Sequence, residues 1–120
     1  MLTNSERKAA LAELTRLENA KAALSERLRQ ERKDAIARKD KAAADKITAA
    51  RARLGHAHLY LLNAKRRINA ATTPKDSIDR LNGLAEDVAR TVRDLKSLAK
   101  VLSAAASLIR ILKALSGAFV

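Results

Sequence analysis

The chain contains no cysteine and no tryptophan, and it has one proline, three glycines, one tyrosine and one phenylalanine in 120 residues. The absence of cysteine excludes disulfide bonds and thiolate metal sites. Proline and glycine are the residues that most often interrupt helices. Their scarcity, together with abundant Ala, Leu, Lys, Arg and Glu, predicts an all-α fold. A core with so few aromatic side chains is thin, and we expect it to be stabilised by self-association or by a larger partner.

Motifs for catalysis and cofactor binding are also missing. There is no Gly-rich phosphate loop, no zinc pattern and no triad-like grouping of side chains. His56 and His58 are the only histidines, and they point to different sides of a helix, so they cannot chelate one metal ion together. The sequence therefore predicts a protein that is not an enzyme and that has no cofactor and no metal site.

A signal peptide is not expected, because Met1 to Arg16 contain no apolar core. No lipidation motif is visible either. The expectation is synthesis in the cytoplasm, with membrane association as an alternative.

Acidic residues are missing from two long segments, Lys46 to Lys75 and everything after Asp94, in a chain of net charge +12. The cations of the first segment form the predicted anion-binding set: Arg51, Arg53, Lys65, Arg66 and Arg67. Such a balance favours nucleic acid, anionic lipid or an acidic protein surface as partner. Nucleic acid is the less favoured of these, because the chain lacks aromatics for base stacking and has no helix-turn-helix or zinc-finger pattern.

Two heptad seams dominate what the chain does contain. The first seam is Ala43, Ile47, Ala50, Leu54, Ala57, Leu61, Ala64, Ile68 and Ala71. The second seam is Ile78, Leu81, Ala85, Val88, Val92, Leu95, Ala99, Leu102, Ala106 and Ile109. Both step by alternating threes and fours, which is the spacing of a coiled coil.

The segment Thr72-Thr73-Pro74 lies between the seams and reads as a helix stop and restart. If the chain folds back there, opposed residues have numbers that sum to 145 or 146. Leu61 then meets Ala85, Ala43 meets Leu102 and Ile47 meets Ala99, so that large residues face small ones. This predicts a long antiparallel two-helix coiled-coil hairpin.

We expect the first helix to cover about residues 4–71 and to begin at a capping box of Thr3 and Glu6. The second is expected over about 74–116, with Gly117 as a left-handed C-terminal residue. The chain is then one domain, 1–120, in which 33–116 form the hairpin.

A third seam occupies the N-terminal part of the chain: Leu14, Leu17, Leu24 and Leu28, with Leu11 beside them. It is out of phase with the seam that begins at Ile36, and a change of seam indicates a change of partner. Since residues 29–34 contain no Gly or Pro, the favoured interpretation is a straight helix whose residues 1–32 overhang the hairpin and pack on another chain. The alternative is a bend near 30–34 and a three-helix fold within one chain.

Residues 98–120 are the most apolar part of the sequence. Those that the hairpin leaves without a partner are Leu98, Val101, Leu108, Ile111, Leu112 and Leu115. Such a strip is typical of a subunit interface or a membrane contact. Arg110 and Lys113 argue against a conventional membrane span.

These patterns predict a non-enzymatic structural protein that self-associates through the apolar C-terminal face and the N-terminal leucine seam. Its expected partner is a second copy or a larger assembly, and one version of the hypothesis places it on or in a membrane as a pore or coat. The alternative is a basic helical scaffold that binds nucleic acid or anionic lipid through residues 46–75.

Overall fold

The structure, a computed structural model, describes residues 3–70, 79, 82–83, 86, 90 and 97–118. Within these ranges the chain is helical apart from short connections, and no strand occurs there. The helices with defined bounds are α1 (Asn4–Ala37), α2 (Lys41–His56), α3 (His58–Asn69) and α5 (Leu98–Ala118). The predicted all-α fold class is confirmed.

Helix α1 begins at the predicted capping box. The Glu6 backbone N–H donates to Thr3 Oγ1, and the Thr3 N–H donates to Glu6 Oε1, both at 3.1 Å. Two backbone donors at the start of the helix are thereby satisfied, which accounts for a helix beginning at Asn4.

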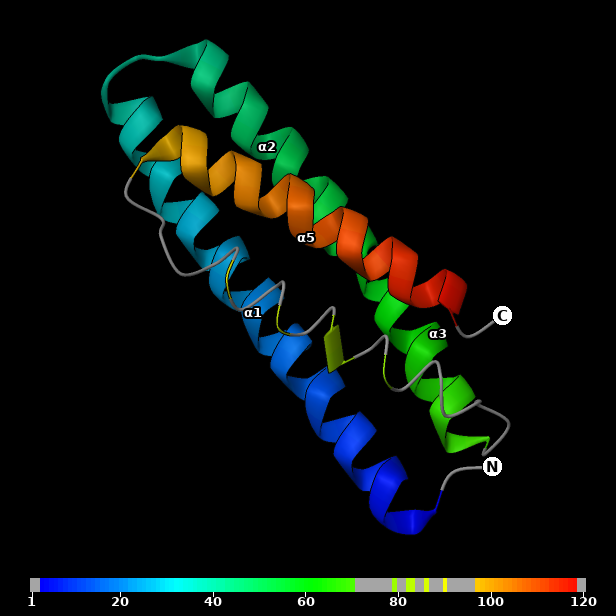
Figure 1. Ribbon diagram of the computed structural model, residues 1–120. Helices are drawn as coiled ribbons and strands as arrows, with labels where there is room; N and C mark the ends of the chain where they lie inside the picture. The colour runs from blue at the N-terminus through cyan, green and yellow to red at the C-terminus, as the bar shows by residue number, and fades with distance from the viewer. Residues whose placement is uncertain are drawn as a thin grey trace.

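The predicted single helix over 4–71 is wrong, because the chain reverses direction between α1 and α2 (Figure 1). Helix α2 returns along α1, and the Arg32 Nε–H donates to Thr48 Oγ1 at 3.1 Å across the two helices. The longest dimension of the molecule is 54 Å, whereas a straight helix over residues 4–71 would measure about 100 Å. Residues 1–32 were expected to overhang a hairpin, but the described part of this segment lies against α2 and α3 of its own chain.

Two helix caps placed back to back produce this turn without Gly or Pro. Lys39 has a positive φ of 61°, its N–H donates to the Ile36 carbonyl, and the Asp40 N–H donates to the Ala35 carbonyl. These two bonds form a Schellman motif that ends α1. The Asp40 carboxylate then accepts from the Ala43 N–H at 3.1 Å and begins α2.

Helices α2 and α3 form one bent rod. The Ala57 N–H still donates to the Arg53 carbonyl, and the Tyr60 N–H donates to the Ala57 carbonyl at 3.0 Å, so the hydrogen bonding is tightened rather than broken. Gly55, two residues earlier, has open space where a Cβ would lie. A side chain at position 55 would therefore meet no neighbouring atom, and the packing of the helices does not require a glycine there.

The apolar seams close on one another inside the chain. Leu17, Leu24 and Leu28 of α1 are at most 1% exposed. The first predicted seam is indeed the buried face of α2 and α3, with these fully or nearly fully buried members: Ile47, Leu54, Ala57, Leu61, Ala64 and Ile68. Both α1 and α5 pack against α2 and α3, so the face was predicted correctly, and α1 is a partner that the predicted hairpin did not include.

Helix α5 runs in the same direction as α2 and α3 (Figure 1). Leu102 lines one groove with Lys46 near the start of α2, and the Asn63 Nδ2–H donates to Ser116 Oγ at 3.1 Å near the end of α3. The predicted antiparallel register is therefore wrong for the described part of the second seam. The expected pairs within 78–95, such as Leu61 with Ala85, lie outside the described residues.

The buried face of α5 also differs from the predicted seam. It consists of Val101, Ala104, Ala105, Leu108 and Leu112. The predicted seam members on this helix are Ala99 and Ala106, which are exposed, and Leu102 and Ile109, which are half-buried. The face that was expected to meet another subunit is therefore the one that packs against α1, α2 and α3.

The second helix, expected over about 74–116, is interrupted at Ser97 and ends later than expected, while its predicted start lies outside the described residues. Ser97 is not helical, and its Oγ accepts from the Lys100 N–H at 3.3 Å, so α5 starts at its own N-cap instead of continuing a helix from 74. At the other end, α5 runs through Gly117 to Ala118, and no described glycine has positive φ. Gly117 therefore does not act as the expected left-handed cap.

Candidate anion-binding surface

Helices α2 and α3 present a surface without acidic residues from Lys46 to Asn69. Four members of the predicted anion-binding set are exposed there: Arg53, Lys65, Arg66 and Arg67. Arg51 is half-buried, and its Nε is enclosed without a hydrogen-bond partner among the described residues. The fold therefore carries four of the five predicted cations to solvent on one bent rod.

The charges of α1 are arranged differently. Arg16 pairs with Glu13 at 3.2 Å, Arg27 pairs with Glu31 at 3.1 Å, and Arg29 pairs with Glu26 at 3.1 Å. Hydrogen bonds from Arg29 and from Gln30 hold the pKa of Glu26 below its ordinary value. Three cations of α1 are thus compensated within one turn of helix, whereas the sequence from Lys46 to Asn69 offers no carboxylate for such pairs.

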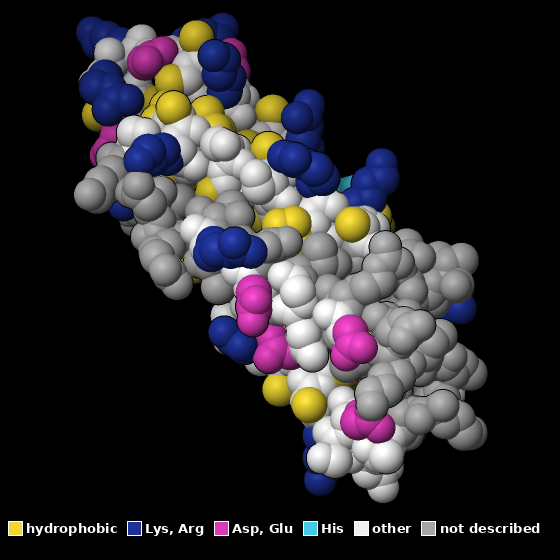
Figure 2. Space-filling model, viewed as in Figure 1, with side chains coloured by type: hydrophobic (Ala, Val, Ile, Leu, Met, Phe, Trp, Pro, Cys, Tyr) yellow, Lys and Arg dark blue, Asp and Glu magenta, His cyan; other side chains and the backbone are white. Residues whose placement is uncertain are grey.

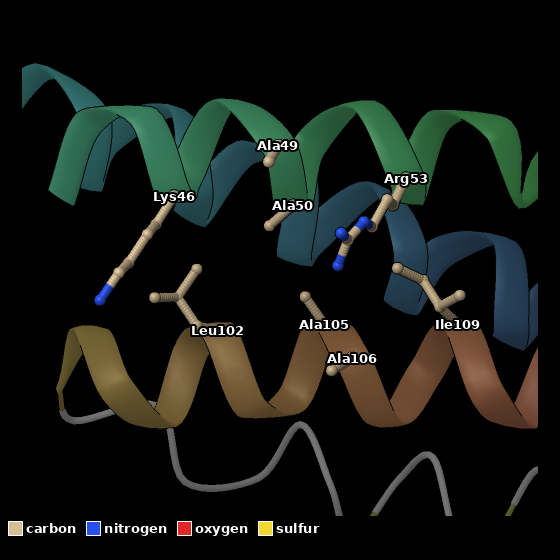
Figure 3. Close-up of a pocket in the computed structure, with 8 residues that line it drawn as sticks. All are labelled: Lys46, Ala49, Ala50, Arg53, Leu102, Ala105, Ala106 and Ile109. Carbon is tan, nitrogen blue, oxygen red and sulfur yellow. The ribbon is translucent and has the colours of Figure 1, made fainter. Parts of the chain in front are cut away.

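An open groove of about 320 Å³ separates α2 from α5 (Figure 3). Its floor and walls are small or apolar: Ala49, Ala50, Leu102, Ala105, Ala106 and Ile109. Lys46 extends from the first half of α2 toward α5, and the Arg53 guanidinium points into the gap two helical turns later. The groove therefore combines an apolar floor with a cation at each end.

A second hollow, of about 340 Å³, continues this groove toward α3. It shares Arg53 and Ile109 with the first and adds His56 and Tyr60. Tyr60 is half-buried against the core, which agrees with a packing role. In the face shown in Figure 2, Lys and Arg side chains surround an apolar area where α2 and α5 pass each other, and acidic side chains lie at the turn after α1 and over α1.

Two large apolar side chains lie among the cations of α3. Leu59 is 54% exposed and Leu62 is 45% exposed. Residues three and four apart are neighbours on a helix, so Leu62 lies beside Leu59, Lys65 and Arg66. We call these four residues, Leu59, Leu62, Lys65 and Arg66, the α3 patch.

The residues predicted to form an oligomer or membrane interface lie mostly in the core. Fully or nearly buried are Leu14, Leu17, Leu24, Leu28, Val101, Leu108 and Leu112. Half-buried against the core are Leu11, Leu98 and Ile111, and the side chain of Leu115 lies outside the described set. Intermolecular contacts through the buried residues would require the bundle to open.

The described residues contain no cluster of three His, Asp or Glu that could hold a metal ion. In the same part of the chain, no helix has both the length and the apolarity needed to cross a bilayer. Comparisons with protein-family models, with curated protein sequences and with solved structures found no match.

Sequence reasoning did not single out Lys46, Leu59 and Leu62. Both leucines carry a visible signal, since they are large apolar residues of an amphipathic helix that fall outside its seam. The position of Lys46 in the groove depends on the direction of α5, for which the sequence holds no comparable signal.

Proposed function

We propose that this chain is a non-enzymatic helical scaffold that binds an anionic partner through α2 and α3. The observation that carries the proposal is the exposure of Arg53, Lys65 and Arg66 on a stretch of helix that contains no acidic residue from Lys46 to Asn69. Because the seams beneath these cations are buried in the core, the helices hold the charges at fixed spacing on a rigid support.

Binding of this kind depends strongly on salt. Each cation that neutralises a phosphate or a similar anion releases condensed counterions, so affinity falls as salt rises. The proposal therefore predicts tight retention on a polyanion at low ionic strength and steep loss at high ionic strength. Nucleic acid and anionic lipid both fit this general description.

The charge-reversal variant Lys65→Glu/Arg66→Glu tests the proposal. We expect it to elute from immobilised heparin at clearly lower salt than the parent. With duplex DNA as probe, the logarithm of the binding constant should depend less steeply on the logarithm of the salt concentration. The magnitude of the slope should decrease by about two, one for each cation removed. Both side chains are exposed, so the fold should persist.

A matched control separates a local surface from overall charge. Lys8→Glu/Lys33→Glu makes the same change in net charge at two exposed positions of α1. The control should shift heparin elution much less than the α3 variant. Equal shifts for both variants would mean that net charge alone determines retention, and the proposed surface would be wrong.

Self-assembly is a second candidate function, and the short turn at Lys39 favours it. Residues 35–44 are mostly good helix formers, and Lys39 holds a left-handed conformation that a non-glycine residue adopts at a cost. If this turn became helical, α1 would leave its own chain and pack its leucine face on α2 and α3 of a second copy. The three-four spacing of these seams also suits coiled-coil packing, which belongs to the same proposal.

Native mass at rising protein concentration tests this second candidate. The parent should form a species of twice 13.1 kDa at high concentration. Lys39→Gly should form less of it, because glycine removes the strain that opening the turn would relieve. A parent that stays monomeric at every concentration would contradict the exchange of α1.

A further inference from the structure

We propose that the anionic partner is a membrane surface, and that the α3 patch inserts Leu59 and Leu62 among its lipids while Lys65 and Arg66 contact the headgroups. This inference rests on the proposed function, because it names the partner of the same basic surface. It commits the chain to lying on a bilayer rather than spanning it.

The two leucines carry the argument. Leu59 is 54% exposed and Leu62 is 45% exposed, whereas Leu61 between them is 1% exposed. Water-exposed leucines beside each other gain nothing from a phosphate backbone, which offers charge but no apolar layer. A bilayer offers both, since acyl chains begin directly beneath the anionic headgroups.

The order of residues along α3 fits this layering. Leu59, Leu62 and Arg66 follow one another at steps of three and four on the solvent side of the helix, opposite the buried Leu61, Ala64 and Ile68. Lysine and arginine have long apolar stems that keep the charge at the headgroup level while a neighbouring apolar residue enters the acyl region. No acidic side chain on α3 opposes approach to an anionic surface.

The groove between α2 and α5 has the same chemical character on an adjoining side of the rod. Leu102 lies between Lys46 and Arg53 there, and Ile109 lies beyond the Arg53 guanidinium (Figure 3). Apolar surface next to cations therefore occurs twice, once on α3 and once between α2 and α5, and both occurrences suit an amphiphilic anion better than a uniformly polar one.

Sedimentation with lipid vesicles tests the inference on the full chain. The probes are vesicles of phosphatidylcholine with 30% phosphatidylserine and vesicles of phosphatidylcholine alone. The parent should bind the anionic vesicles and not the neutral ones. Leu59→Gln/Leu62→Gln should lower the vesicle partition coefficient about tenfold or more, because two side chains no longer enter the acyl region.

Two comparisons make the result specific. Ile36→Gln removes an apolar side chain of matching exposure, 53%, at the end of α1 outside the patch, and it should leave vesicle binding unchanged. Elution of Leu59→Gln/Leu62→Gln from heparin should equal that of the parent, since heparin is an anion without an apolar layer. Circular dichroism of both variants checks that the helices remain, as expected for exposed positions.

The outcomes distinguish the inference from the function on which it rests. Loss of vesicle binding with unchanged heparin elution supports the membrane assignment. Unchanged vesicle binding in Leu59→Gln/Leu62→Gln overturns it while leaving the basic surface intact. If Lys65→Glu/Arg66→Glu changes neither heparin elution nor vesicle binding, the proposed function itself fails.

Discussion

At the scale of single residues, Lys39 and Asp40 decide the course of the chain. Sequence reasoning read 4–71 as one helix because residues 29–40 contain no glycine or proline. The structure reverses the chain with a left-handed lysine and an aspartate N-cap. Asp40 is a typical N-cap residue and was a visible signal, but a lysine at the left-handed position has no such signature, because its cost is met by contacts elsewhere in the fold.

Lys39→Gly should therefore stabilise the monomer. A left-handed conformation costs a non-glycine residue roughly 1–2 kcal/mol, and glycine loses roughly 0.5–1 kcal/mol of that gain through its greater unfolded-state entropy. We expect urea denaturation to show an unfolding free energy higher by about 0.5–1 kcal/mol. Lys39→Ala removes the same charge but keeps the Cβ and should bring no gain; an alanine variant more stable than the glycine variant would contradict the assignment.

At the scale of helices, periodicity identified faces better than partners. The seam from Ile47 to Ile68 is buried as predicted, whereas the leucine seam of α1 is buried within its own chain and not against another. Large residues facing small ones made the hairpin at 72–74 attractive, but a seam of alternating alanine and leucine satisfies this rule with several partners. The α1 seam is one of them, and the turn at Lys39 brings it into place. The choice among partners depends on turns, which heptad spacing does not encode.

Helix α5 provides a prediction that separates the two registers. In the structure Leu108 is fully buried and Leu102 is half-buried, whereas the sequence-derived hairpin would bury Leu102 and leave Leu108 outside. Leu108→Ala should lower the unfolding free energy by about 2–5 kcal/mol, the usual cost of emptying a buried leucine site, and Leu102→Ala should cost clearly less. Thermal melts of both variants measure the difference. The reverse order would contradict the described position of α5.

The candidate site was predictable in part. The acid-free segment pointed to Arg53, Lys65, Arg66 and Arg67 from the sequence, and all four are exposed. Arg51 was in the same set, yet it is half-buried, because which flank of a helix meets a neighbour depends on where that neighbour packs. Leu59 and Leu62 became candidates only with the structure, because the packing of the helices shows that both stay exposed outside the described core.

At the scale of the whole molecule, one chain closes its leucine seams on itself and leaves the basic, partly apolar surface of α2 and α3 for the proposed anionic partner. Because the chain closes on itself, aliphatic side chains from α1, α2, α3 and α5 form one core. The same closure limits the longest dimension of the molecule to 54 Å. It also explains why the proposed binding surface lies on α2 and α3, since the seams that sequence reasoning assigned to other subunits are occupied within the chain.

Cross-linking within one chain tests closure most directly, because a protein without cysteine accepts two unique ones. The variant Arg32→Cys/Thr48→Cys replaces the pair that forms a hydrogen bond between α1 and α2, and a short bismaleimide reagent is added at dilute protein concentration. Closure within the chain predicts an internally linked monomer of about 13.1 kDa in the mass spectrum. In a straight helix the two positions would lie about 24 Å apart, so a product found only at twice that mass, or no product, would contradict closure within the chain.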